Sequence, residues 1–266
     1  MVGLITACVA ILLVAALMTM TGRGGGNFYV PILVACGLPM LQAATTGQCV
    51  LLATAMTATF VFHRSRAIDW KLACVIDPPT DVMALAGGYY AHLLPAGALK
   101  AVFAAMLVFA GFLMLRPARE RFASARNRPG CWHRRFGEHE YVVHLWLALP
   151  LTAATGLVAG MVGVSGGSFK VPLMVLACGV PMRVAVGTST AMVAATALMG
   201  LAGHVAAGDF HAAWALPMSA AAVVGGLLGG AFSLQVRART LKTVFAGTTL
   251  VAALFMAINA WLSRVG

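Results

Sequence analysis

The chain has 266 residues, of which 61% are hydrophobic and only 9% are charged, and its formal net charge is +11. Soluble domains carry about 25% charged residues, so this composition excludes an ordinary soluble domain and predicts a membrane protein. In a soluble protein such a charge would suggest a nucleic-acid partner. Here the basic residues lie between apolar runs, where they act as orientation signals, and we expect no nucleic-acid partner.

Eight apolar runs follow one another along the chain, and most have about the 20 residues that a helix needs to cross a bilayer. They cover residues 2–20, 41–61, 72–94, 99–115, 142–162, 184–205, 212–234 and 243–262. The first run lacks a basic start and a clear cleavage site, so we expect a retained helix and not a signal peptide. These features predict an all-α integral membrane protein within the lipid bilayer.

A glycine-rich stretch directly after the first run recurs in the second half of the chain. The first copy reads Thr21-Gly-Arg-Gly-Gly-Gly-Asn-Phe-Tyr-Val-Pro31, and the second reads Met161-Val-Gly-Val-Ser-Gly-Gly-Ser-Phe-Lys-Val-Pro172, at an offset of 141. The match continues one residue later in register, where Cys36-Gly-Leu-Pro-Met40 corresponds to Cys178-Gly-Val-Pro-Met182. Pro79 later corresponds to Pro217. Agreement in order over this length indicates an internal repeat.

We therefore interpret the chain as a tandem duplication. Residues 1–115 form the first membrane repeat, and residues 141–266 form the second. Between them, residues 116–140 carry seven arginines and three glutamates without an apolar run. This segment is expected to be a basic, hydrophilic linker.

The basic residues change sides between the two repeats. The loop after residues 41–61 contains Arg64, Arg66 and Lys71, whereas the equivalent loop at residues 203–211 has no lysine or arginine. In the second repeat the basic residues follow the next apolar run instead, at Arg237, Arg239 and Lys242. By the positive-inside rule the repeats are inverted, with the linker cytoplasmic and both termini outside. Inverted repeats are typical of secondary transporters, whose substrate site lies near the midplane.

Inversion requires an odd number of membrane crossings in each repeat. Three long runs end each repeat, so the first helix and the glycine stretch contribute either two crossings or none. Five extended residues and a ten-residue helix would span roughly 30 Å, one hydrocarbon thickness. A re-entrant hairpin fits the charge pattern equally well, so the sequence predicts Gly-broken or re-entrant short helices that meet near the midplane.

Glycine breaks at membrane depth are the best indication of a substrate site. Non-helical backbone survives there only where protein or a watered cavity surrounds it. The short helices that follow would direct the free amides of Asn27 and Phe28, and of Ser168 and Phe169, toward a bound anion. Arg23 and Lys170 add positive charge, and hydroxyl and amide side chains add uncharged donors. The candidate substrate-binding residues are Gly22, Arg23, Gly24, Gly25, Gly26, Asn27, Thr45, Thr46, Gln48, Gly166, Gly167, Ser168, Lys170, Thr188, Ser189 and Thr190.

Structural roles compete with this interpretation. The glycines could serve close helix packing, Arg23 could reach an interface, and the hydroxyl groups could cap helices or bond between them. The coincidence of all these features in both repeats favours a site. Asp81 is the candidate for proton coupling because intramembrane carboxylates are costly, whereas Asp77 could pair with a basic residue of a nearby loop. No metal or cofactor is expected. The chain also lacks a clear nucleophile and base or metal cluster, so we do not expect an enzyme.

The repeated motifs resemble those of the TauE/SafE family of membrane permeases, often described as sulfite exporters. The resemblance rests on Gly22-Arg-Gly-Gly-Gly26, Val30-Pro-Ile-Leu33 and Gly37-Leu-Pro39, and again on Gly163-Val-Ser-Gly-Gly167, Val171-Pro-Leu-Met174, Gly179-Val-Pro181 and Gly187-Thr-Ser189. It departs at Thr45-Thr-Gly47, where the first repeat lacks the G-T-S triplet.

This resemblance implies a transporter that exports a small anionic substrate, such as sulfite, sulfoacetate or another organosulfonate, across a bacterial inner (plasma) membrane. An anion channel, or an importer of another small anion, is the alternative. The sequence leaves open whether the chain forms a homo-oligomer.

Overall fold

The computed structural model describes residues 2–22, 24–95, 97–99, 101–102, 105, 108, 130–164, 166–208, 212–237, 239–241, 243–244, 247, 250–251, 254 and 258. Its elements in chain order are α1 (Val2–Thr19), α2 (Gly26–Ala35), α3 (Met40–Arg64), α4 (Trp70–Ile76), α5 (Pro78–Tyr90), η1 (Ala91–Leu93), β1 (Cys131–Phe136), β2 (His139–His144), α7 (Leu145–Val162), α8 (Gly167–Pro172), η3 (Leu173–Ala177), α9 (Met182–Ala206) and α10 (Ala212–Ser233). Most residues of the apolar runs 99–115 and 243–262, and residues 116–129 of the expected linker, lie outside this description.

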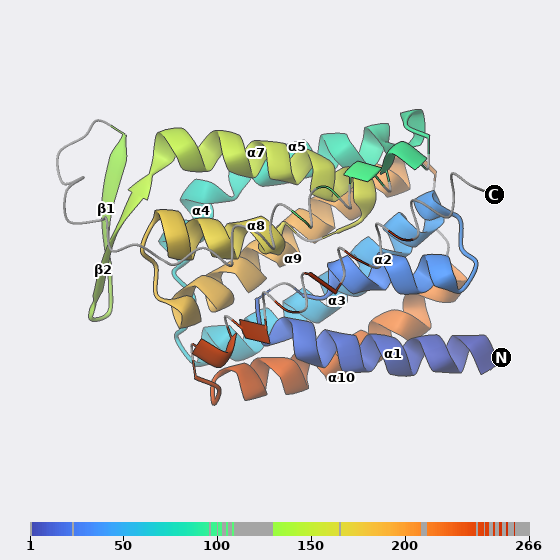
Figure 1. Cartoon of the computed structure of the whole chain (residues 1–266), viewed down its shortest axis with the longest axis horizontal. Helices are drawn as coiled ribbons and strands as arrows, with labels where there is room; N and C mark the ends of the chain where they lie inside the picture. The colour runs from blue at the N-terminus through green and yellow to red at the C-terminus, as the bar shows by residue number, and fades with distance from the viewer. Residues whose placement is uncertain are drawn as a thin grey trace.

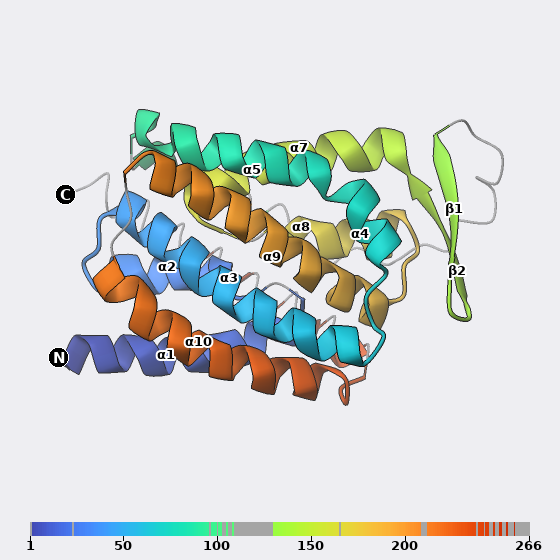
Figure 2. The same cartoon turned by 180° about the vertical axis from the view of Figure 1, so that it is seen from behind.

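The helices form two groups that meet where α3 packs against α9 (Figures 1 and 2). One group contains α1, α2, α3 and α10, and the other contains α4, α5, α7, α8 and α9. The first group therefore includes α10 from the second half of the sequence, and the second group includes α4 and α5 from the first half. α5 packs on α7 and α9, and α10 packs on α1 and α3.

Glycine at the crossings lets these helices approach closely. A Cβ on Gly156 of α7 would lie 2.7 Å from the Thr80 Cα of α5, and one on Gly203 of α9 would lie 2.7 Å from the Tyr89 amide nitrogen. The α10 crossings are similar, because a Cβ on Gly226 would lie 2.7 Å from the Thr54 carbonyl oxygen. Small residues at such positions permit backbone-to-backbone packing in a membrane. The packing role of glycine thus holds at the helix crossings.

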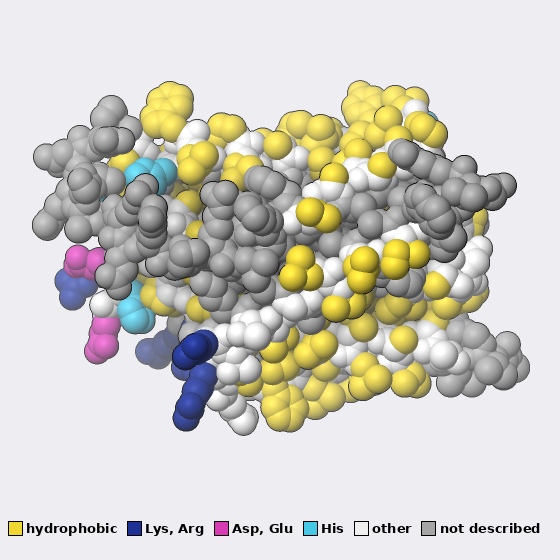
Figure 3. Space-filling model, viewed as in Figure 1, with side chains coloured by type: hydrophobic (Ala, Val, Ile, Leu, Met, Phe, Trp, Pro, Cys, Tyr) yellow, Lys and Arg dark blue, Asp and Glu magenta, His cyan; other side chains and the backbone are white. Residues whose placement is uncertain are grey.

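Four of the described helices are long and apolar enough to cross a membrane, namely α3, α7, α9 and α10. α1 and α2 are shorter apolar helices. In Figure 3, hydrophobic side chains are spread over the described surface along the helices, and charged side chains gather at the end that carries the β1–β2 hairpin. Apart from Lys170, the described lysines and arginines belong to loops, helix ends and strands at this hairpin end. The integral membrane character predicted from the sequence is confirmed.

The apolar run 72–94 is divided between two helices at Asp77. Pro78 and Pro79 begin α5, and neither can donate an amide hydrogen to the preceding turn. α4 therefore ends at Ile76, and Asp77 lies at a bend between the two helices. α10 instead continues through its single Pro217.

A β-hairpin corrects the prediction of an all-α fold. β1 and β2 pair antiparallel, with Cys131 opposite His144, and Gly137 adopts a φ of 58° in the two-residue turn. Such turns favour glycine because they require positive φ. The hairpin falls at the end of the expected linker and continues past residue 140. Alternate side chains on β2, Tyr141 and Val143, are buried against α4 and η3, a strand periodicity that was missed beside the arginines.

Asp69 connects this hairpin to the helices through hydrogen bonds. Its buried carboxylate accepts 2.9 and 2.8 Å hydrogen bonds from Arg134, another from the Tyr141 hydroxyl, and two from backbone amides at the start of α4. Burial alone would raise the pKa of Asp69, but the bonds from Arg134 and Tyr141 outweigh it, and the pKa lies below its ordinary value. The Asp69 amide also donates to the Thr188 hydroxyl of α9 at 3.0 Å.

The first glycine break turns the chain back inside the bundle. α1 runs parallel to α10, since Gly225 lies against Leu12 and the Ser233 hydroxyl donates to the Met20 carbonyl at 3.0 Å. The C-terminal end of α1 therefore lies beside the last residue of α10. After the break, α2 returns to the end at which α1 began (Figure 1). The break itself is a series of turns, with positive φ at Gly22, Gly24 and Gly25, and not the extended segment considered above.

A π-helix explains the change of register between the two copies of the motif. The sequence match moves from an offset of 141 at Pro172 to 142 at Cys178. Between these residues η3 is a π-helix, and the Cys178 amide donates to the Leu173 carbonyl five residues earlier. A π-turn holds one more residue than an α-turn. The extra residue of the second copy is therefore accommodated in η3, whereas α2 is α-helical throughout.

Gly156→Val should destabilise the protein by about 1–3 kcal/mol, because the added side chain collides with the α5 backbone at Thr80. Thermal unfolding in detergent measures this change. Gly97→Ala is the control, since a Cβ there meets nothing within 4 Å. Equal midpoints for the two variants would contradict the proposed packing of α5 on α7.

Asp69→Asn should destabilise the protein at neutral pH by about 1.5–3 kcal/mol, because bonds to a charged group are lost. The folded pKa of Asp69 is lowered, so its contribution is complete above the ordinary pKa of about 4 and disappears as pH falls through the folded value. The gap between wild type and Asp69→Asn should therefore narrow in acid. Glu140→Gln is the control, because its 4.0 Å pair with Arg135 is exposed and contributes little.

Candidate functional site

The first break packs against α9 of the other half. A Cβ on Gly22 would lie 2.6 Å from the Val186 carbonyl oxygen, and the Ser189 hydroxyl donates to the Gly22 carbonyl at 3.0 Å. Both α9 residues lie within the first two turns of that helix. The structure thus brings together Gly22 and Ser189, two of the predicted site residues.

The second break packs against α3 in the corresponding way. A Cβ on Gly163 would lie 2.6 Å from the Ala44 carbonyl carbon, and one on Gly47 would lie 3.3 Å from the Gly163 carbonyl oxygen. Gly163 corresponds to Gly22 at an offset of 141, and Ala44 corresponds to Val186 at 142. Each break is therefore closed by the equivalent turn of the opposite half.

The amides at the starts of the short helices differ from the prediction. The Phe28 amide donates to the Gly25 carbonyl at 2.9 Å, and the Phe169 amide donates to the Gly166 carbonyl at 3.0 Å. Neither amide is free for an anion, because the first turn closes one residue earlier than expected. Gly26 and Asn27 at the start of α2 are buried, as are Gly166 and Gly167 at the second break. Arg23 and the Ser168 side chain lie outside the described residues.

Four of the remaining predicted donors form hydrogen bonds within the protein, and Thr46 does not. Thr45 and Thr190 donate to carbonyls of their own helices, at 3.0 and 2.8 Å. Thr188 accepts from Asp69, and Gln48 donates to the Ala159 carbonyl of α7 at 3.2 Å, so these two join separate elements. Thr46 is buried and its hydroxyl has no hydrogen-bond partner. Intrahelical and interhelical bonding therefore accounts for much of this set.

Gly24 and Gly25 complete the first break near the middle of the bundle. A Cβ on Gly24 would lie 3.3 Å from the Val193 side chain of α9, and one on Gly25 would lie 2.5 Å from the Tyr29 hydroxyl. Tyr29 is fully buried, and its hydroxyl lies 3.0 Å from the Thr54 hydroxyl of α3. The end of the first break therefore packs against a buried tyrosine–threonine pair, formed by Tyr29 and Thr54.

Lys170 has a carboxylate partner that the sequence did not assign to it. Its side chain is fully buried, and its ammonium forms an ion pair with Asp77 at the bend between α4 and α5. A 7% exposed fraction of the Asp77 side chain places this pair inside the protein. Asp77 therefore pairs with the predicted anion-binding lysine itself and not with a basic loop residue. Asp77 and Lys170 are 93 positions apart in sequence. Their pairing is therefore visible only in the folded structure, where the chain bends directly before Pro78.

Thr196 joins this pair to Asp81. The Lys170 ammonium donates to the Thr196 hydroxyl at 2.7 Å, and Thr196 lies 2.9 Å from both the Asp81 carboxylate and the Met192 carbonyl. Asp81 is half-buried. One lysine, one threonine and two aspartates thus form a connected group, which we call the charged cluster (Asp77, Asp81, Lys170 and Thr196). Thr196 was missed by the sequence analysis.

The first break has an uncharged counterpart of the charged cluster. Tyr29 corresponds to Lys170 at an offset of 141, and Thr54 corresponds to Thr196 at 142. The offset of 138 between Pro79 and Pro217 pairs the two aspartates with Ala215 and Ser219. The tyrosine–threonine pair therefore occupies the position of the lysine–threonine pair, without ionised groups. A threonine at the same offset in both copies was the signal that could have identified Thr196.

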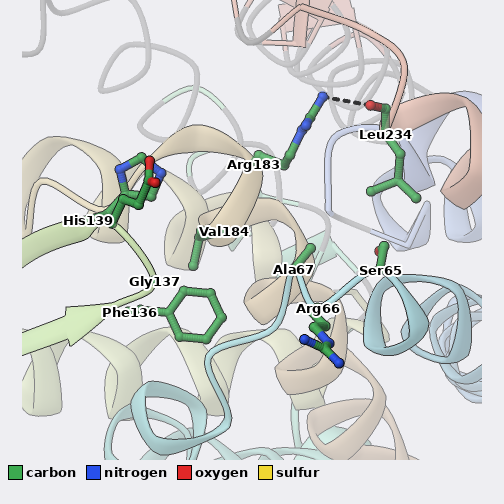
Figure 4. Close-up of a pocket in the computed structure, with 10 residues that line it drawn as sticks. Ser65, Arg66, Ala67, Phe136, Gly137, His139, Arg183, Val184 and Leu234 are labelled. Atoms are coloured by element: carbon green, nitrogen blue, oxygen red, sulfur yellow. Dashed lines mark hydrogen bonds between the residues drawn. The ribbon is translucent and has the colours of Figure 1, made fainter.

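A cavity of about 380 Å³ lies at the hairpin end (Figure 4). Its lining includes Arg66, Ala67, Phe136, His139, Arg183 and Val184. In Figure 4 the Arg183 side chain is directed toward the Leu234 carbonyl, to which it donates at 2.6 Å. Ala67 packs on Gly187, and the adjacent Val186 packs on Gly22. One packed layer therefore separates this cavity from the first break, and none of the predicted site residues that the structure describes lines it.

Lys170→Met should destabilise the folded protein by about 3–5 kcal/mol, because it leaves Asp77 buried without its ion-pair partner. Adding Asp77→Leu should recover most of this loss, since an apolar pair of similar volume replaces the ion pair. Thermal unfolding of the purified variants measures both effects. Additive losses in the double variant would show that Lys170 and Asp77 do not interact.

Comparisons with known proteins place the chain in a family. The family model described as "Sulfite exporter TauE/SafE" matches residues 7–256. A probable membrane transporter protein of Bacillus subtilis, YunE, is 22% identical over 237 residues, 85% of this chain and 87% of its own length. A probable membrane transporter protein of Xylella fastidiosa is 24% identical over 262 residues, 95% and 94% of the two chains. No solved structure matches the chain significantly.

The family match extends over both glycine breaks, both short helices and all four candidate spans. The expectation of a transporter, and not an enzyme, is thereby confirmed. The chain is a membrane transporter of the TauE/SafE family.

Proposed function

We propose that this chain moves a small sulfur-containing anion across the membrane by alternating access at a site between two inverted repeats. Sulfite, sulfoacetate and other organosulfonates are the proposed substrates, and export is the proposed direction. The substrate class draws on the family description, which names sulfite export. The repeats are the two membrane segments 1–115 and 141–266 inferred from the internal sequence match.

The crossed packing of the glycine breaks carries this proposal. Gly22 rests on Val186, and Gly163 rests on Ala44, at equivalent positions of the two sequence copies. Discontinuous helices that face each other across repeats typically form the substrate site of secondary transporters. Relative movement of the two helix groups would open this packing toward one side of the membrane at a time.

The hairpin end is proposed to face the cytoplasm. The described lysines and arginines other than Lys170 belong to this end, and cytoplasmic loops carry an excess of lysine and arginine. The cavity beside Arg66 and Arg183 would then be the cytoplasmic approach to the first break. The plasma membrane is the proposed location.

Counterflow in proteoliposomes tests the proposal. Vesicles loaded with unlabelled sulfite, sulfoacetate, methanesulfonate, taurine or sulfate receive a trace of the labelled compound outside. A carrier of the sulfur-containing anions should accumulate label transiently and saturate, because outward and inward movements exchange at one site. A channel would give no transient accumulation. Lack of counterflow with all five compounds would contradict the proposed substrate class.

Arg23→Ala and Ser189→Ala are the informative variants for the first break. Loss of the Ser189 hydroxyl removes its bond to the Gly22 carbonyl, and Arg23 is the proposed anion-binding charge. Both should lower the counterflow rate, whereas Gly97→Ala should not, because Gly97 has no neighbour within 4 Å of an added Cβ. Normal counterflow in both site variants would show that the first break does not bind the substrate.

A further inference from the structure

We propose that the charged cluster links transport of each singly charged anion to movement of one proton in the same direction. The inference rests on the proposed anion transport and adds the coupling ion. It assigns Asp77 as an internal substitute for the substrate, since its carboxylate occupies the Lys170 ammonium that an incoming anion would need.

Charge balance carries the first step. The cluster contains one cation and two carboxylates, Asp77 and Asp81, around a buried Lys170. Ionised groups inside a membrane are costly unless they are neutralised. With one bound proton the cluster is neutral.

The hydrogen bonds of Thr196 indicate where that proton lies. A threonine hydroxyl has one hydrogen to donate and two lone pairs to accept. Thr196 accepts from Lys170 and has two further oxygen neighbours at 2.9 Å, the Asp81 carboxylate and the Met192 carbonyl. The carbonyl can only accept. All three contacts are satisfied together when Asp81 carries the proton and donates it to Thr196, which then donates to Met192.

Anion binding then requires a second proton. An anion that takes the place of Asp77 on Lys170 leaves the Asp77 carboxylate buried without a cation. Water on the entry side supplies one proton to Asp77, so that the charges of the cluster and the bound anion together still sum to zero. On the other side the anion leaves, Asp77 returns its proton to water, and the pair with Lys170 re-forms. A monovalent anion is thus carried without net charge.

Comparison with the equivalent residues in the other half of the chain indicates that these charges are not needed for packing. Tyr29 and Thr54 make the equivalent contact at 3.0 Å with neutral groups, and Ala215 and Ser219 stand where the aspartates would be. The same architecture therefore tolerates an uncharged layer. A costly buried ion pair retained in one copy points to a functional role.

Other titratable groups near the cluster do not compete for this role among the described residues. Those on α4, α5, η1 and α9 are Lys71, Cys74, Tyr89, Tyr90, His92, Arg183 and His204, and α7 has none. Cys74 is exposed, and the rest lie at or near helix ends. On α9, Arg183 bonds the Leu234 carbonyl and His204 bonds the Gly160 carbonyl. Asp77 and Asp81 are thus the acids that Lys170 faces.

Transport in proteoliposomes at a clamped membrane potential tests the coupling. The probe is methanesulfonate, because this sulfonate carries a single negative charge near neutral pH, and an internal pH dye reports protons. Wild type should move about one proton per anion charge, and its rate should not respond to the potential. Asp77→Asn cannot take up the second proton, so its proton-to-anion ratio should fall toward zero and its rate should become potential-dependent.

Two further variants make the result decisive. Ser219→Ala changes the uncharged layer of the other half and should keep the wild-type ratio. Lys170→Tyr combined with Asp77→Ala and Asp81→Ser reproduces the neutral layer that the chain already contains, and should abolish proton movement linked to the anion. Counterflow by wild type without accompanying protons would overturn the coupling and leave the transport proposal intact. Absence of wild-type counterflow would overturn both.

Discussion

This structure depends on one constraint, namely that backbone N–H and C=O groups inside a membrane must find hydrogen-bond partners within the protein. The described residues between α1 and α2, at positions 20–22, 24 and 25, leave regular helix inside the bundle, where no lipid group can bond them. Protein from the other half closes this gap, through the Ser189 hydroxyl on the Gly22 carbonyl and the α9 backbone at Val186. The second break is closed by α3 at Ala44. Neither half can therefore form its break without the other.

The two breaks pack against equivalent turns of the opposite half but differ in chemistry. Tyr29 and Thr54 fill one with neutral hydroxyl groups, whereas Lys170 and Thr196 fill the other together with the aspartates of the α4–α5 bend. A buried ion pair is weak evidence for stability but good evidence for function inside a membrane. In the proposed coupling, the charged side chains of the cluster serve transport, and the glycines serve close packing of the helices. The Tyr29–Thr54 pair is then the uncharged reference with which the Lys170–Thr196 pair can be compared.

Much of the fold was predictable because membrane burial leaves strong sequence patterns. Long apolar runs indicated α3, α7, α9 and α10, and glycines before Pro31 and Pro172 indicated both breaks. The β-hairpin was missed, since two short strands beside an arginine-rich segment have little hydrophobic signal. The free amides at Phe28 and Phe169 were predicted wrongly, because sequence does not define at which residue a helix turn closes. The binding roles of Arg23 and the hydroxyl residues stay predictions.

The sequence by itself determined the membrane class, the internal match and the position of each break, because these depend on composition, periodicity and spacing along one chain. Tertiary structure decided which groups meet. It placed α5 and α10 in the helix group of the opposite half, and it set Asp77 against Lys170 across 93 residues. Such contacts depend on the bend at Pro78 and on glycines that let helices approach. Local residue patterns carry no information on partners so distant in sequence, so only folding in space could reveal that the expected anion-binding lysine already holds a carboxylate.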